Sequence, residues 1–184
     1  MSRLTLLILS SVLSPLVLRA ATPPSISDIF DNQITAIERD VVPLAEAMPA
    51  LKFNFAPSKG GAFSDVRSFS LEATHVATVL YEVSSAMLEE KCPVEIGINE
   101  NGPASLKTKP EIMEYLTGAF AYAHKAMRTL TASNLTEMIQ SPFGKALVPR
   151  ASLASIGAWH TMDHYGQMVV YARMNGIIPP ASRH

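Results

Sequence analysis

Four stretches of this sequence repeat their apolar residues at intervals of three and four, which is the period of an α-helix. Little of the chain alternates as a β-strand does. The four stretches run from about residue 27 to 48, from 64 or 68 to 91, from 110 to 132 and from 152 to 175. At 1.5 Å per residue, helices of about 22 to 25 residues are each about 35 Å long. We therefore expect an all-α protein.

Proline and glycine separate the predicted helices in the stretches 57–61, 93–103 and 142–149, and residues 176–180 end the fourth helix. The connections are about 15 to 20 residues long, which is enough chain to run the full length of a helix. Of the 184 residues, 48% are hydrophobic, and this is sufficient for one core. The sequence predicts a single four-helix bundle in which consecutive helices can run parallel.

Residues 1–21 have the features of a secretory signal peptide. Arg3 precedes an apolar run of about 15 residues, and two small alanine residues follow it. The run is shorter than the about 20 residues of a membrane span, and Pro15 interrupts it. We predict a cleaved signal, a folded domain of residues 22–184, a secreted or periplasmic location, and no stable membrane insertion after cleavage. An uncleaved anchor helix is the alternative interpretation.

The chain carries 15 basic and 16 acidic residues, so its formal net charge is −1. Without a basic excess there is no electrostatic attraction for phosphates, and we expect no nucleic-acid partner. Cys92 is the single cysteine, so no disulfide can form within the chain. It follows a predicted helix and precedes Pro93. We expect Cys92 in a loop, as a bystander in preference to a reactive thiol.

His160 and His164 give the strongest local sign of chemistry. Residues four apart on a helix lie on one face with their Cβ atoms about 5–6 Å apart, a spacing at which two imidazoles can bind one ion. A helical wheel places both within the apolar stripe of the fourth helix, with Leu153, Ile156 and Tyr171. The pair therefore points into the bundle, although core or solvated histidines can show the same spacing.

His75 adds a third inward imidazole, because it shares a face of the second helix with Leu71 and Val79. Three such rings are costly to bury without partners, and one divalent metal ion would satisfy all three. We predict that His75, His160 and His164 bind one metal ion. Three core histidines without a metal are the alternative.

Four other polar residues are candidates for the site. His124 of the third helix is either a fourth ligand or a substrate contact, or, as we prefer, a partly exposed histidine without such a role. Glu72 and His75 form an E-x-x-H unit of the kind found in di-metal bundles, but the fourth helix offers no second unit. Glu82 and Asp163 could orient a ligand or, like Glu72, act as a general acid or base.

Two longer blocks of sequence are more specific than the histidine spacing. The block FNFAPSKGGAFSDVRSFSLEATH ends at His75, and the block HTMDHYGQMVVYARMNGIIPP begins at His160. With them, nearly all of the chain after residue 21 resembles the DinB-like (DinB/YfiT) metalloenzyme family. The resemblance implies a four-helix bundle with up-down-down-up topology, and a metal site of His75, His160 and His164. It also implies a homodimer.

The same resemblance implies a range of functions. Family members carry nickel, zinc or other divalent ions, so zinc or nickel is the expected cofactor, although imidazole also suits copper and iron. Activities in the family include metal-dependent hydrolysis and thiol-dependent transfer or isomerisation. Export would take the chain away from cytosolic thiols, so we expect a hydrolase acting on a small-molecule substrate. A thiol-dependent transferase or isomerase, and a non-catalytic bundle that binds a metal or a small molecule, are the alternatives.

Overall fold

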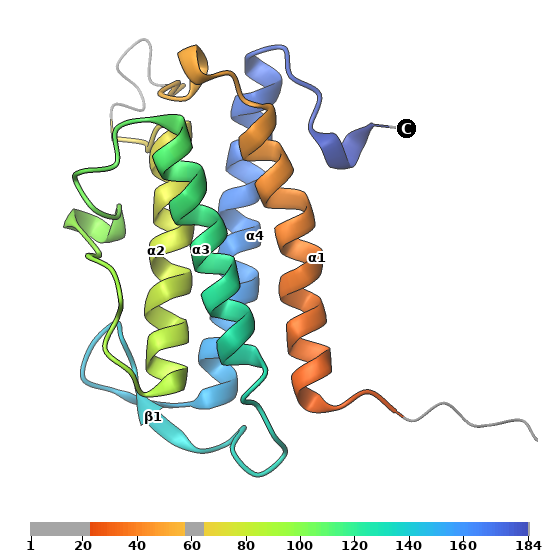
Figure 1. Cartoon of the computed structure of the whole chain (residues 1–184), viewed down its shortest axis with the longest axis vertical. Helices are drawn as coiled ribbons and strands as arrows, with labels where there is room; N and C mark the ends of the chain where they lie inside the picture. The colour runs from red at the N-terminus through yellow and green to blue at the C-terminus, as the bar shows by residue number, and fades with distance from the viewer. Residues whose placement is uncertain (1–22, 58–64, 184) are drawn as a thin grey trace, which may run out of the picture.

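A computed structural model describes residues 23–57 and 65–183 of the chain. Figure 1 shows four long helices, α1 (Ile26–Ala47), α2 (Phe69–Leu88), α3 (Lys109–Met127) and α4 (Arg150–Met174). The shorter elements are the 3-10 helices η1 (Ala50–Lys52), η2 (Ile98–Glu100) and η3 (Pro180–Ser182), and the antiparallel strands β1 (Met138–Gln140) and β2 (Leu147–Pro149). The predicted all-α four-helix bundle is confirmed. The predicted signal peptide, residues 1–21, lies outside the described residues.

Side-chain caps fix where three of the helices begin. The Ser25 hydroxyl accepts a hydrogen bond from the backbone N–H of Asp28, and the Asp28 carboxylate accepts one from the backbone N–H of Ser25. This reciprocal capping box satisfies two donors at the start of α1 that have no partner within the helix. Ser68 caps α2, and Thr108 caps α3 in a second capping box with Glu111. α1, α3 and α4 begin within two residues of their predicted starts, and α2 begins at Phe69, next to the later of its two predicted starts, 64 and 68.

Two helices end earlier than the sequence predicts. α2 ends at Leu88, and not at residue 91, because Glu89 adopts the left-handed conformation with φ of 54°. α3 ends at Met127, and not at residue 132, because the chain turns there and the backbone N–H of Leu130 bonds back to the carbonyl of Met127. The β1–β2 hairpin is also not predicted, since strands of three residues are too short to show an alternating pattern.

Hydrogen bonds between helix ends show the directions of the four helices. At one end of the bundle, Lys109 at the start of α3 donates to the carbonyl of Met48, just after α1. Lys52, also after α1, donates to the carbonyl of Asn175 at the end of α4. At the other end, Arg150 at the start of α4 donates to a carbonyl in the last turn of α2. α1 and α4 thus run in one direction and α2 and α3 in the other, which is the up-down-down-up order visible in Figure 1.

α2 is the most buried of the four helices, with 17 of its 20 residues buried. It packs against α3 and α4, and residues 89–108 run back along one of its sides (Figure 1). Three titratable side chains of α2, Glu72, His75 and Glu82, are consequently inside the protein. Because buried charge is costly unless it is paired or neutralised, these three residues are where a functional site is to be sought.

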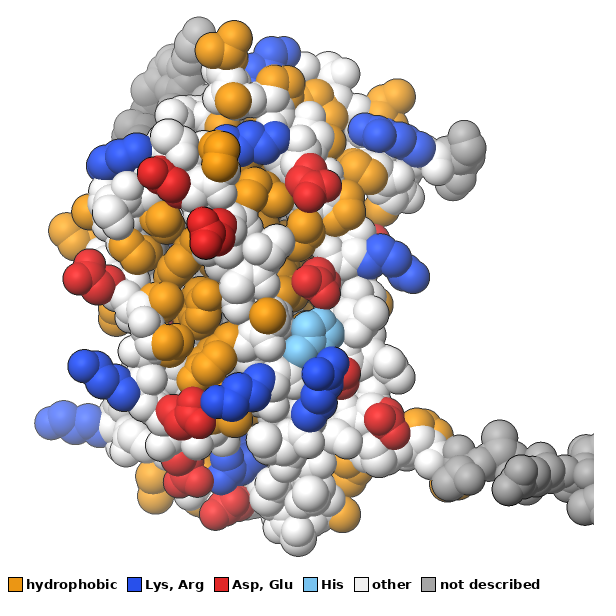
Figure 2. Space-filling model, in the orientation of Figure 1, with side chains coloured by type: hydrophobic (Ala, Val, Ile, Leu, Met, Phe, Trp, Pro, Cys, Tyr) orange, Lys and Arg blue, Asp and Glu red, His pale blue; other side chains and the backbone are white. Residues whose placement is uncertain are grey.

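The outer surface is mixed in charge. Figure 2 shows acidic and basic side chains interspersed over one face, which agrees with the net charge of −1. Within residues 23–57 and 65–183, no helix is both long enough and apolar enough to cross a membrane.

Candidate metal centre

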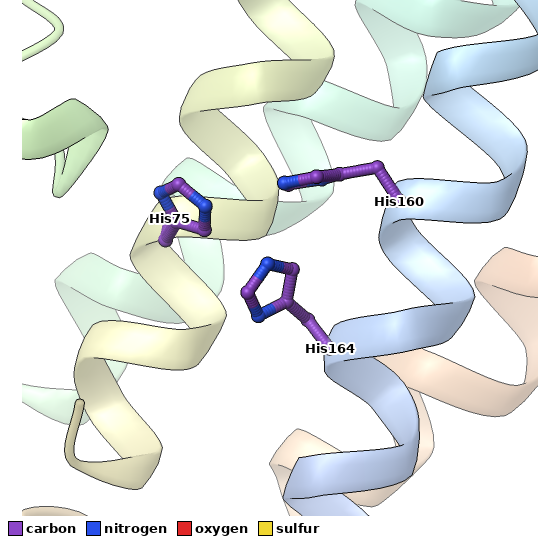
Figure 3. A group of neighbouring side chains, drawn as sticks. All are labelled: His75, His160 and His164. Carbon is purple, nitrogen blue, oxygen red and sulfur yellow. The ribbon is translucent and has the colours of Figure 1, made fainter. Parts of the chain in front are cut away.

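His75, His160 and His164 converge in the interior between α2 and α4 (Figure 3). One nitrogen of each ring lies within 4.8 Å of the corresponding nitrogens of the other two. The ring centroids are 5.0 Å apart for His75 and His160, 4.7 Å for His75 and His164, and 4.5 Å for His160 and His164. Three nitrogens bound tetrahedrally to one ion at about 2.0–2.1 Å are about 3.4 Å from one another. Small side-chain movements would therefore complete such a site.

The His75 ring is oriented by a backbone carbonyl. Its Nδ1 lies 2.9 Å from the carbonyl oxygen of Glu100 in η2. Because a carbonyl only accepts hydrogen bonds, Nδ1 carries the proton and Nε2 keeps its lone pair for an ion. Asn99 and Glu100 both have positive φ, 55° and 51°, and Arg67 holds this segment by donating to the Asn99 carbonyl and to the Asn101 side chain. Arg67 thus fixes the loop that orients His75.

The His164 ring is oriented by a carboxylate. Its Nδ1 lies 2.5 Å from Oε2 of Glu72, whose side chain is only 2% exposed. An ionised carboxylate only accepts, so Nδ1 of His164 carries the proton and Nε2 is free. The sequence suggested Glu72 as half of a di-metal unit or as a general acid or base. The structure places it behind His164 instead, in the carboxylate–histidine pairing common at metal sites.

His160 completes the donor set. Its Nδ1 is buried and has no hydrogen-bond partner among the described residues. Burial is the main cause that lowers the pKa of His160 to about 3, with smaller effects from His164, His75 and Arg67. Burial also lowers the pKa of His75. Both rings are therefore neutral at neutral pH, as metal-binding imidazoles must be, and the three side chains fit a divalent ion such as zinc or nickel.

His124 does not join this cluster. Its Nδ1 lies 2.5 Å from a carboxylate oxygen of Asp31, and its Nε2 lies 3.1 Å from one of Glu38. Both acidic residues are on α1, so His124 links α3 to α1. The hypothesis that His124 is a fourth ligand is wrong, because both of its ring nitrogens are engaged on the other side of α3.

Glu82 and Asp163 do not reach the histidines either. Asp163 is exposed, and the hydrogen bond recorded for its carboxylate comes from Gln167 on the same helix. Glu82 lies two turns beyond His75 on α2, with one buried oxygen that has no hydrogen-bond partner among the described residues. Of the three carboxylates that the sequence suggested, Glu72 alone is hydrogen-bonded to one of these histidines in the described part of the chain.

A family model for the DinB superfamily matches residues 33–168, which is more than two thirds of the chain. The matched segment begins within α1, ends within α4 and contains all three clustered histidines. A search of the curated proteins found no match.

Proposed function

The chain belongs to the DinB superfamily, and we propose that it is an exported metal-dependent hydrolase in which His75, His160 and His164 hold one divalent ion. The supporting observation is the convergence of three imidazoles, two of which have their tautomer set by Glu100 and Glu72. Zinc or nickel is the expected ion, since neutral imidazole suits both. The substrate would be a small molecule.

Such an ion would act as a Lewis acid toward water or a carbonyl group, which is what hydrolysis of an ester, amide or lactone requires. The surrounding side chains support that use. Neutral histidines leave the charge of the ion uncancelled, and Glu72 makes His164 a more basic ligand through their hydrogen bond. Because its carboxylate is committed to His164, Glu72 is a positioning residue in this proposal, not the general base.

A thiol-dependent transferase or isomerase would use the same histidines and is the alternative. We prefer hydrolysis because the predicted signal peptide would remove the chain from cytosolic thiols. In addition, Cys92, the only thiol of the chain, lines a cavity whose lining does not include the three histidines. A non-catalytic bundle that binds a metal or a small molecule would show metal content without turnover. A homodimer stays a prediction.

Metal content tests the first part of the proposal. Protein purified without a histidine tag should carry about one divalent ion per chain, and occupancy should fall below about pH 6 as protons compete for imidazole. His75→Ala, His160→Ala and His164→Ala should each lose most of the metal. His124→Ala is the matched control and should keep it, because His124 pairs with α1. Full metal content in all three cluster variants would place the site elsewhere.

Activity assays test the second part. A panel of ester, amide and lactone substrates, with and without added metal, should reveal hydrolysis that His160→Ala and His164→Ala abolish. A conjugation assay with a low-molecular-weight thiol runs in parallel. Thiol conjugation that requires the same histidines, with no hydrolysis, would assign the alternative. No turnover in either assay from metal-loaded protein would favour the non-catalytic bundle.

A further inference from the structure

A cavity lies beside the C-terminal end of α2, which is the end farther from the three histidines. Its volume is about 430 Å³, within the range of small-molecule sites. The last turns of α2, the segment that follows them, and residues 140–142 of the β1–β2 hairpin form its walls. Figure 1 shows β1 beside this end of α2. The cavity is therefore built from two separate parts of the chain, residues 82–96 and 140–142.

The charged residues that line this cavity are all acidic, and two of the three are already paired. Glu89 accepts from Arg150 at 3.1 Å, and Glu90 accepts from Lys125 at 2.9 Å. Glu82 differs from both. Glu82 is only 7% exposed, and its Oε2 has no hydrogen-bond partner among the described residues. A buried carboxyl group without a partner is costly. A bound ligand that donates a hydrogen bond to Glu82 would therefore stabilise this carboxyl group.

The other walls are largely apolar and include Ala86, Ile96 and Pro142. A ligand that fits must therefore combine an apolar body with a group that donates hydrogen bonds to a carboxylate. A cationic donor satisfies Glu82 best, because charge-assisted hydrogen bonds are roughly twice as strong as neutral ones. We propose that the cavity binds a small organic amine as its ammonium ion, with the ammonium group on Glu82 and the apolar part against Ala86 and Ile96. This site is independent of the histidine cluster.

The titration of Glu82 agrees with a buried carboxyl group that has an acidic neighbour. Burial, together with the charge of Glu100, raises the pKa of Glu82 to about 7. The titratable groups around it are Glu100 of η2, Tyr115 of α3, and Glu89, Glu90 and Cys92 at the end of α2. None of them is cationic, and the two cations that contact this group, Lys125 and Arg150, are paired with Glu90 and Glu89. A proton and an ammonium ion would compete for Glu82, so ammonium affinity should rise about ninefold from pH 6 to pH 8, as the ionised fraction grows from about 10% to about 90%.

Isothermal titration calorimetry of the full protein with hexylammonium chloride, and with 1-hexanol as a neutral analogue, tests the proposal. At pH 8, hexylammonium should bind at least about tenfold more tightly than hexanol. Glu82→Gln keeps the shape of the side chain and removes its charge, so it should weaken hexylammonium binding at least about tenfold and abolish the pH dependence. Glu90→Gln is the matched control. It should change the affinity less than about twofold, because Glu90 is already paired with Lys125.

A second variant keeps the test decisive if Glu82→Gln does not fold, which circular dichroism would show. Ala86→Phe fills the cavity without changing its charge and should abolish binding of both probes. No detectable binding of hexylammonium to the wild-type protein would overturn the proposal. Equal affinity for hexanol, or unchanged hexylammonium binding in Glu82→Gln or Ala86→Phe, would overturn it as well.

Discussion

Removing the charge of Glu72 should weaken metal binding without removing a metal ligand. Glu72 is 2% exposed, and its carboxylate accepts a 2.5 Å hydrogen bond from Nδ1 of His164. That bond does two things for a metal site. The bond fixes the tautomer that leaves Nε2 of His164 free, and the negative charge of Glu72 makes the His164 ring more basic. Substitutions of Glu72 can separate these two effects.

The expected magnitudes follow from what each substitution leaves in place. Glu72→Gln keeps an oxygen that can accept from Nδ1 but loses the charge, whereas Glu72→Ala loses both. Changes to residues that orient metal ligands typically cost about 10- to 100-fold in affinity. We therefore expect about a 10-fold loss for Glu72→Gln and about a 100-fold loss for Glu72→Ala, or about 1.4 and 2.7 kcal/mol of binding free energy.

Competition for zinc against a chromophoric chelator would measure these affinities. Glu82→Gln is the matched control, because Glu82 is on the same helix and 7% exposed but touches none of the three histidines. It should bind zinc within about twofold of the wild-type protein. If Glu72→Ala also stays within about twofold, Glu72 does not orient His164. If Glu82→Gln loses as much affinity as Glu72→Gln, the loss reflects a general disturbance of α2.

Three further outcomes are expected from other parts of the chain. Arg150→Ala should lower the free energy of unfolding in urea by about 2–4 kcal/mol, because it leaves the Met87 carbonyl and two carboxylates without their donor; a loss below about 1 kcal/mol would contradict this. Because the folded pKa of Glu82 is about 7 and its ordinary value is 4.5, the stability it contributes is fully present below about pH 4.5 and is lost as pH rises through about 7. In urea unfolding, the free energy of unfolding of Glu82→Gln relative to that of the wild-type protein should therefore rise by up to about 3 kcal/mol from pH 4.5 to pH 8. A difference between the two proteins that stays constant with pH would contradict this. Intact mass of the native protein should place the mature N-terminus between residues 20 and 24, and an uncleaved cytosolic chain would refute the signal peptide.

The helices and the inward direction of the three histidines follow from the sequence, because helical period fixes which residues share a face. His160 and His164 are four residues apart, and the wheel that grouped them with Leu153 and Tyr171 was right about that face, since His164 and both of these neighbours are buried. Periodicity alone does not say which helices become neighbours. The meeting of His75 with the α4 pair was predicted from the cost of burying three unpartnered imidazoles and was also implied by the family resemblance, and the structure shows it.

The groups that orient the histidines were harder to foresee. Glu72 and His75 are three residues apart, so both can face α4 from α2. The E-x-x-H spacing is that of a di-metal unit, which the absence of a second unit on the fourth helix argued against, but it did not show that Glu72 would pair with His164. The Glu100 carbonyl has no sequence signature, since every residue has one. Its position depends on positive φ at Asn99 and Glu100, which are non-glycine residues that rarely adopt that conformation.

The parallel arrangement of α2 and α3 connects these features physically. Because both helices run in the same direction, the chain must travel the length of α2 between them, and residues 89–108 do so along its side (Figure 1). Early in that path, Ile96 lines the cavity beside Glu82. Further along, Glu100 places its carbonyl against His75. A bundle with a short hairpin between antiparallel α2 and α3 would leave this side of α2 to solvent, where water would solvate His75 and Glu82 and no cavity would form. The crossover that sets the topology therefore also supplies one orienting group of the candidate metal centre and one wall of the proposed amine site.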